Sequence, residues 1–133
     1  MKTRYGIDTS ILVRLLTGDP AKDFDKTVRA LEVLLKHEPA AAFHASNQVI
    51  GEAYIAVQHH YGVSKAEARA ALLAVLSSGL VAPLDGLPVL DAIRSTEGCG
   101  LMDRLIAGDY QTRGLTTLTH DRKMGSLTGG MRL

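Results

Sequence analysis

Residues 4–16 read RYGIDTSILVRLL and join two apolar stretches of different character. Residues 4–7 are typical of a short strand, and residues 10–18 have the pattern of a helix. Asp8 interrupts the two stretches where the strand should end. A carboxylate in that position either caps the following helix or belongs to a functional site. Acids in comparable positions elsewhere in the chain would favour the second interpretation.

The composition is that of a soluble globular protein. Of 133 residues, 46% are hydrophobic and 22% are charged, which predicts one compact domain over residues 1–133. The formal net charge of +1 argues neither for nor against a nucleic-acid partner. Cys99 is the single cysteine, which excludes an intrachain disulfide framework and a cysteine zinc cluster and fits a cytoplasmic location. No apolar run approaches membrane-spanning length, and the first residues lack the apolar core of a signal peptide.

The remaining sequence alternates strand-like and helix-like segments. The most distinct helix begins after Ser64, which forms a capping-box pattern with Glu67. The other predicted helices cover about 20–37, 48–62, part of 86–98 and 101–114; the later strands cover 40–46, 80–84 and 115–119. Residues 128–133 either form a short edge strand or fray. This alternation predicts an α/β fold with a parallel sheet covered by helices on both faces.

A second acid repeats the position of Asp8. Asp121 follows the predicted strand 115–119 by two residues. In a parallel α/β sheet the functional crevice lies beyond the carboxyl ends of the strands. If both strands are central and parallel, Asp8 and Asp121 face the same crevice. The alternative is that each one only caps a helix or forms a turn.

Two further acids lie on helices. The helical angle puts Glu52 at the edge of an apolar stripe, and Asp103 shares a face with apolar residues in the first turn of its helix. Glu52 alone could be a boundary residue whose carboxylate reaches solvent, and Asp103 could only favour the helix N-terminus. Asp109 competes with Asp103, because periodicity alone does not exclude it.

Four converging carboxylates would require a counter-charge. Like charges in one cleft repel, so protons or a cation must neutralise some of them. Oxygen ligands without cysteine suit a hard cation, namely Mg²⁺ or alternatively Mn²⁺. A cation of this kind activates water for attack on a phosphodiester and neutralises the charge that develops on the phosphate.

Four blocks of the sequence, at these separations, resemble the PIN-domain ribonucleases. The blocks are IDTSILVRLLTGD (7–19), NQVIGEAY (47–54), GCGLMDRLIAG (98–108) and LTTLTHDRKMGSL (115–127). Within that family, the chain is most similar to the toxin component of VapBC-type toxin–antitoxin pairs. The resemblance covers about residues 5–127. Each block is weakly specific alone, but the ordered set of acids is a strong joint signal.

The resemblance implies roles for individual residues. Asp8, Glu52, Asp103 and Asp121 would be the catalytic acids and metal ligands, with Asp8 and Asp103 as the principal magnesium ligands. Asp109 matches no acidic position of the family pattern. Thr9, Ser10 and Thr119 would support the site by orienting carboxylates and water, although Thr9 and Ser10 could instead cap a helix. His120 receives no role in catalysis, and His59 and His60 are expected to cap a helix or line the surface, with metal binding as the less favoured alternative.

The same resemblance implies a fold and partners. The fold would be a three-layer α/β domain with a four- to five-stranded parallel sheet flanked by helices. The protein would act on RNA as an endoribonuclease, form a homodimer and be held inactive by a small antitoxin protein. Basic residues near the acids would meet the RNA phosphates, or else are solvated surface charges. The candidates are Arg14, Arg104, Arg113, Arg122 and Lys123.

Other functions are compatible with parts of this pattern. An RNA-processing PIN nuclease without an antitoxin would have the same acids. A non-catalytic RNA- or protein-binding domain would typically lack one or more of them, and all four are present. A phosphoacceptor receiver domain would need paired acids after its first strand, whereas Asp8 stands alone there.

Overall fold

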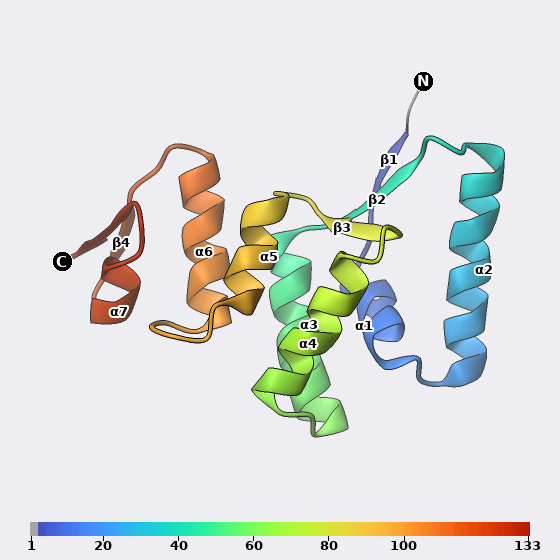
Figure 1. Cartoon of the computed structure of the whole chain (residues 1–133), viewed down its shortest axis with the longest axis horizontal. Coiled ribbons are helices and arrows are strands. Elements are labelled where there is room, and N and C mark those ends of the chain that lie inside the picture. The colour runs from blue at the N-terminus through green and yellow to red at the C-terminus, as the bar shows by residue number, and fades with distance from the viewer. Residues whose placement is uncertain (1–2) are drawn as a thin grey trace.

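The computed structural model describes residues 3–133 (Figure 1). The helices are α1 (Thr9–Thr17), α2 (Ala21–His37), α3 (Asn47–Tyr61), α4 (Lys65–Leu76), α5 (Leu87–Arg94), α6 (Leu101–Thr112) and α7 (Arg122–Gly125). The strands are β1 (Arg4–Gly6), β2 (Ala42–Ala45), β3 (Val81–Pro83), β4 (Thr117–Thr119) and β5 (Gly130–Arg132). None of the helices in this range has the length and apolar character needed to cross a membrane.

The alternation of strands and helices confirms the predicted α/β class, but the number of strands in the sheet does not match. The main sheet contains three parallel strands in the order β1-β2-β3. Strand β4, which was expected to join it, pairs with β5 in a separate two-stranded parallel sheet. The predicted four- to five-stranded sheet is therefore wrong for a single chain over residues 3–133. The residues of β1 to β4 were predictable, whereas residues 128–133 were left as either a strand or a frayed end. The pairing of β4 is decided by where the C-terminal segment packs.

The core lies on one face of the main sheet. Tyr5, Phe43 and Val81 stand at matching register positions, and the rings of Tyr5 and Phe43 stack with centroids 5.5 Å apart. Leu12 of α1 and Leu72 of α4, both fully buried, belong to the same apolar cluster. Burying such side chains is the main contribution to the stability of a domain of this size.

The opposite face of the sheet is open, which corrects the expectation of helices over both faces. Gly6 and Ala82 are exposed on this face, with His44 between them. A Cβ atom at Gly6 would meet no other atom within 4 Å. The helices that follow β3 do not cover this face, because α5 packs against α4, and α6 packs against α3 and α5.

Local sequence signals define the helix ends. Gly18 and Gly62 end α1 and α3 in the left-handed conformation, each with φ of 64°, which glycine adopts without a steric penalty. Ser46 caps α3 through its hydroxyl, which accepts the Val49 N–H at 3.2 Å. These ends determine where the chain leaves each helix, and so where the residues beside Asp8 and Glu52 lie.

The C-terminal segment lies apart from the main sheet. Figure 1 shows α7 and β4 on the far side of α6 from β1, β2 and β3. Thr117 is 4% exposed because β4 packs against α6. On the outer side, Leu118 is 59% exposed and Met131 is 52% exposed. Within residues 3–133, β4 pairs only with β5, so its other edge is unpaired and its apolar side is exposed.

The capping box of α4 makes part of the stability pH-dependent. The backbone N–H and then the hydroxyl of Ser64 hold the pKa of the Glu67 carboxyl below its usual value. A carboxyl whose pKa is lowered in the folded state stabilises the protein above the pKa of the unfolded chain, about 4.3, and loses this effect as the pH falls.

We expect Glu67→Gln to lower the melting temperature slightly at pH 7. The difference from the parent should shrink as the pH falls below about 4, where Glu67 becomes protonated in both states. Thermal denaturation followed by circular dichroism from pH 7 to pH 3 measures it. Glu32→Gln, an exposed substitution on α2, is the control. A difference in melting temperature that stays constant from pH 7 to pH 3 would show that the Glu67 carboxylate does not cause the pH dependence.

Candidate functional site

Asp8 lies at the carboxyl end of β1 and caps α1. Its Oδ1 accepts the Thr9 N–H at 2.7 Å, and its carbonyl accepts the N–H groups of Ile11 and Leu12. The side chain is exposed, so this carboxylate is not buried between the two apolar stretches that surround it in sequence. Capping uses one carboxylate oxygen and leaves the other for a further contact.

Glu52 is held next to Asp8 by Thr9. The Thr9 hydroxyl donates to Glu52 Oε2 at 2.7 Å, and Gln48 Nε2 donates to Glu52 Oε1 at 3.3 Å. The packing of α1 against α3 brings these groups together although they are 43 positions apart. Thr9 therefore contacts both acids, through its N–H and through its hydroxyl. Ser10, its exposed neighbour, shares the first turn of α1.

Asp103 occupies the first turn of α6, where the positive end of the helix dipole favours a carboxylate. Its side chain is half-buried. The N-terminal turn of α6 lies against α3, because a Cβ at Gly51 would stand 2.8 Å from Met102 Cε. Gly51 thus permits the close approach of the two helices that carry Asp103 and Glu52.

Asp121 lies in the C-terminal segment and caps α7. Its Oδ2 accepts the Met124 N–H at 2.6 Å, and its own N–H donates to Thr119 Oγ1 at 3.0 Å. This segment is on the far side of α6 from β1 (Figure 1). The structure therefore does not bring Asp121 to Asp8 within one chain, in contrast to the expectation that both face one crevice.

Asp109 has a structural partner. Its Oδ1 accepts a hydrogen bond from Asn47 Nδ2 at 2.8 Å, and the same amide nitrogen donates to the Leu105 carbonyl at 3.2 Å. Asn47 is 6% exposed at the start of α3. The amide group of Asn47 thus joins α3 to α6, a role that no local sequence pattern indicated.

A groove of about 710 Å³ runs between α3 and α6. Glu52 and Asp109 supply carboxylates to its lining, while Ile55 and Ile106 supply exposed apolar side chains. His59 and His60 also line it, as their surface position suggested. The groove is therefore partly apolar and carries negative charge.

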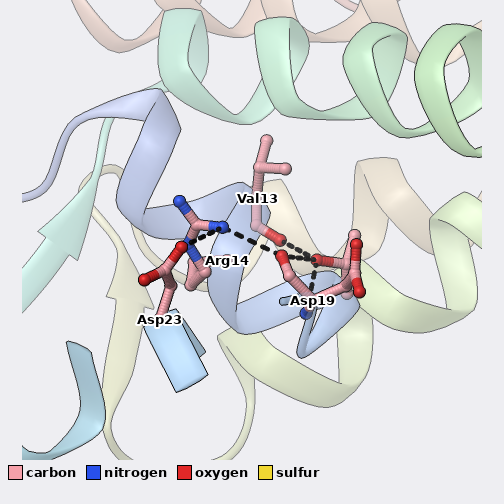
Figure 2. A network of polar contacts seen from close by, with 5 residues as sticks. Val13, Arg14, Asp19 and Asp23 are labelled. Atoms are coloured by element: carbon pink, nitrogen blue, oxygen red, sulfur yellow. Dashed lines mark hydrogen bonds and ion pairs between the residues drawn. The ribbon is translucent and has the colours of Figure 1, made fainter. Parts of the chain in front are cut away.

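The Arg14 side chain already makes an ion pair and a hydrogen bond within the protein. Figure 2 shows its guanidinium between the Asp23 carboxylate, at 3.7 Å, and the Asp19 carbonyl, at 3.0 Å. The neighbouring Thr17 hydroxyl donates to the Val13 carbonyl at 2.9 Å. This network ties the end of α1 to the start of α2, so Arg14 would have to leave it to reach an RNA phosphate.

The other basic candidates differ in whether their side chains already donate hydrogen bonds to the protein. Arg104 folds back onto the carbonyls of Glu97 and Cys99, at 2.5 and 3.2 Å, and Arg113 donates to the Asp109 carbonyl at 3.0 Å. Arg122 and Lys123 are exposed on α7, immediately after Asp121. These last two are the best placed of the candidates to contact a phosphate backbone.

The donor set of a single chain does not amount to a complete metal site. Carboxylate oxygens of Asp8 and Glu52 are the right kind of ligand for a hard cation. Among residues 3–133, however, no group of three or more His, Cys, Asp or Glu side chains is placed to hold one metal ion. Asp8, Glu52 and Asp103 therefore do not form such a group by themselves, and Asp121 belongs to the separate C-terminal segment.

The family model of the PIN domain matches residues 5–129. No curated protein and no solved structure shows a significant match to the chain. The family match covers almost the whole sequence, and the chain therefore belongs to the PIN-domain family. PIN domains are generally nucleases that act on RNA and typically use divalent metal ions.

Replacing Asp109 separates its structural role from that of Asp103. We expect Asp109→Ala to destabilise the fold by about 1.5 kcal/mol, because the buried Asn47 amide loses a charged acceptor. Asp103→Ala, on the same helix, should change stability by no more than about 0.5 kcal/mol, the effect of one charge at a helix N-terminus. Urea denaturation of both variants measures the difference. Equal losses would show that Asp103 is also structural.

Proposed function

We propose that this protein is a metal-dependent endoribonuclease that hydrolyses RNA phosphodiester bonds as the toxin of a type II toxin–antitoxin pair in the cytoplasm. The observation that carries the proposal is the Thr9 bridge, which holds Asp8 and Glu52 together at the carboxyl end of β1. Membership of the PIN family supports the nuclease activity. The toxin role rests on the sequence resemblance to VapBC-type toxins.

The proposed chemistry assigns each group a simple task. Asp8 and Glu52, with Asp103 and Asp121, would hold Mg²⁺ or Mn²⁺, which would supply an activated water and neutralise charge on the phosphate. Thr9 and Thr119 keep the neighbouring acids in position through their hydrogen bonds. Arg122 and Lys123 bind the phosphates that flank the scissile bond.

The proposed antitoxin would exploit the same charges. A basic side chain from a small partner protein can pair with the Asp8 and Glu52 carboxylates and so block cation and substrate together. A homodimer is part of the proposal. An RNA-processing nuclease without an antitoxin would share the active-site predictions and differ only in lacking that inhibitor.

RNA cleavage should depend on the carboxylates of Asp8 and Asp103 as metal ligands and not on helix capping. We expect Asp8→Asn and Asp103→Asn to remain folded, because Asn caps α1 as well as Asp8 does and Asp103 makes no cap bond in α6. Both should lose Mg²⁺-dependent RNA cleavage by at least about 100-fold, because Asn is a poorer ligand for a hard cation. Asp25→Asn, on the exposed side of α2, is the matched control. Cleavage of single-stranded RNA with and without EDTA measures the effect. Full activity of either variant would remove that residue from the mechanism.

RNA binding should depend on α7. We expect Arg122→Ala and Lys123→Ala to weaken RNA binding and to reduce the slope of log affinity against log salt by about 0.7 for each charge removed. Arg29→Ala on α2 is the control. Fluorescence anisotropy with a labelled RNA at several salt concentrations, in the absence of divalent ions, gives the slope. An unchanged slope would show that α7 does not contact the phosphates.

A further inference from the structure

Among residues 3–133, no strand pairs with the outer edge of β1, and the hydrogen-bonding groups on this edge can be identified. Thr3 and Ile7 use their backbone groups toward β2, since the Thr3 carbonyl accepts an N–H at 3.2 Å and Ile7 donates one at 2.9 Å. Alternate residues of a parallel strand direct these groups to opposite sides. The C=O of Arg4 and the N–H of Gly6 therefore face the open edge.

Strand β4 has a complementary edge. Thr117 donates its N–H to β5 at 2.8 Å, and the Thr119 carbonyl accepts an N–H from the end of the chain at 2.9 Å. The N–H and C=O of Leu118 accordingly point away from β5. A two-stranded sheet is marginal by itself, and parallel sheets are normally covered on both faces. The edge of β4 is thus as incomplete as that of β1.

We propose that β4 of one copy of this chain pairs in parallel with β1 of a second copy, so that the exchange completes both sheets and both active sites. The two edges determine the register. With Leu118 opposite Tyr5, the Leu118 N–H donates to the Arg4 carbonyl and the Gly6 N–H donates to the Leu118 carbonyl. The result is one five-stranded parallel sheet in each half of a two-fold symmetric dimer.

This register places apolar side chains next to one another on the same face of the sheet. The exposed side chains of Leu118 and its neighbour Met131 continue the apolar row of Tyr5, Phe43 and Val81. On the other face, Thr119 comes next to Gly6, where there is open space for its side chain. A slip by one residue would exchange these faces and leave Leu118 on the open one.

The register also aligns the acids. Asp8 follows Tyr5 by three residues, and Asp121 follows Leu118 by three residues. Neighbouring strands lie about 4.8 Å apart, so the two carboxylates emerge level at one edge of the sheet. Arg122 and Lys123 arrive with Asp121 and face the negative charges of Asp8 and Glu52 of the second copy.

The segment that precedes β4 favours a second copy over the same chain. Gly114 donates its N–H to Gln111, and Leu115 donates to Tyr110, at 3.0 and 2.9 Å. These bonds hold the connection on the end of α6, and Thr117 is buried against that helix. With β4 fixed beyond α6, only another molecule brings a β1 edge to it.

Disulfide trapping tests the pairing without reference to activity. Gly6→Cys and Thr119→Cys, each with Cys99→Ala, are co-expressed on chains with tags of different size. Directly opposite residues of paired strands have Cα atoms close enough for a disulfide. Oxidation should give a covalent dimer of the two different chains. Ser126→Cys, exposed on the same segment but away from the β4 edge, replaces Thr119→Cys in the control and should give none.

Two results would overturn the proposal. One is the absence of a mixed disulfide together with a monomeric mass in light scattering. The other is a disulfide within a single chain when Gly6→Cys and Thr119→Cys are combined, because this would show that β4 pairs with its own β1.

Complementation adds a test that rests on the proposed function. Asp8→Asn and Asp121→Asn should each be inactive, whereas their co-expressed mixture should recover about a quarter of the parental cleavage rate, since half of random dimers are mixed and each mixed dimer has one complete site. No recovery from a mixture whose parent is active would contradict the exchange. If the parent itself cleaves no RNA, the proposed function fails, and the disulfide experiment still decides the pairing.

Discussion

The open backbone edge of β1 is the constraint on which the rest of this structure depends. A strand inside a parallel sheet must satisfy N–H and C=O groups on both sides, and within the part of the chain that the structure describes β1 has a partner on one side only. Asp8 follows β1 closely in the sequence. The strand that pairs with β1 therefore also determines which residues lie next to Asp8. Whatever strand occupies the edge brings its own carboxyl end, and the residues that follow it, next to Asp8.

An acid of the candidate site can therefore cap a helix and still offer an oxygen to a cation. Asp8 and Asp121 each cap a helix with one carboxylate oxygen, which orients the side chain and leaves the second oxygen available. Glu52 is held by Thr9 across two helices. Asp109 is different in kind, because its carboxylate is committed to the buried amide of Asn47. Helical periodicity does not distinguish Asp103 from Asp109 as a site residue, whereas the hydrogen bond from Asn47 to Asp109 does.

The packing of α6 links these observations. Its N-terminal turn carries Asp103 and approaches α3 through Gly51, and its C-terminal turn holds the connection to β4. One helix thus positions an acid on one side and keeps another acid away on the other. The proposed exchange of β4 between two copies would bring Asp121 to Asp8 without moving α6, so it addresses the short sheet and the distant acid together.

The sequence by itself determined the local structure of this protein. Its periodicity, the capping box at Ser64 and the glycines at 18 and 62 specify where helices begin and end, because these signals act within one or two turns. It also identified Asp8 and Asp121 as acids at strand ends. The tertiary structure decided which strands pair, which face of the sheet is covered and which acids meet. These depend on contacts between residues far apart in the chain, such as Thr9 with Glu52 and Thr117 with α6, and no local pattern encodes whether β4 lies beside β1 or beyond α6.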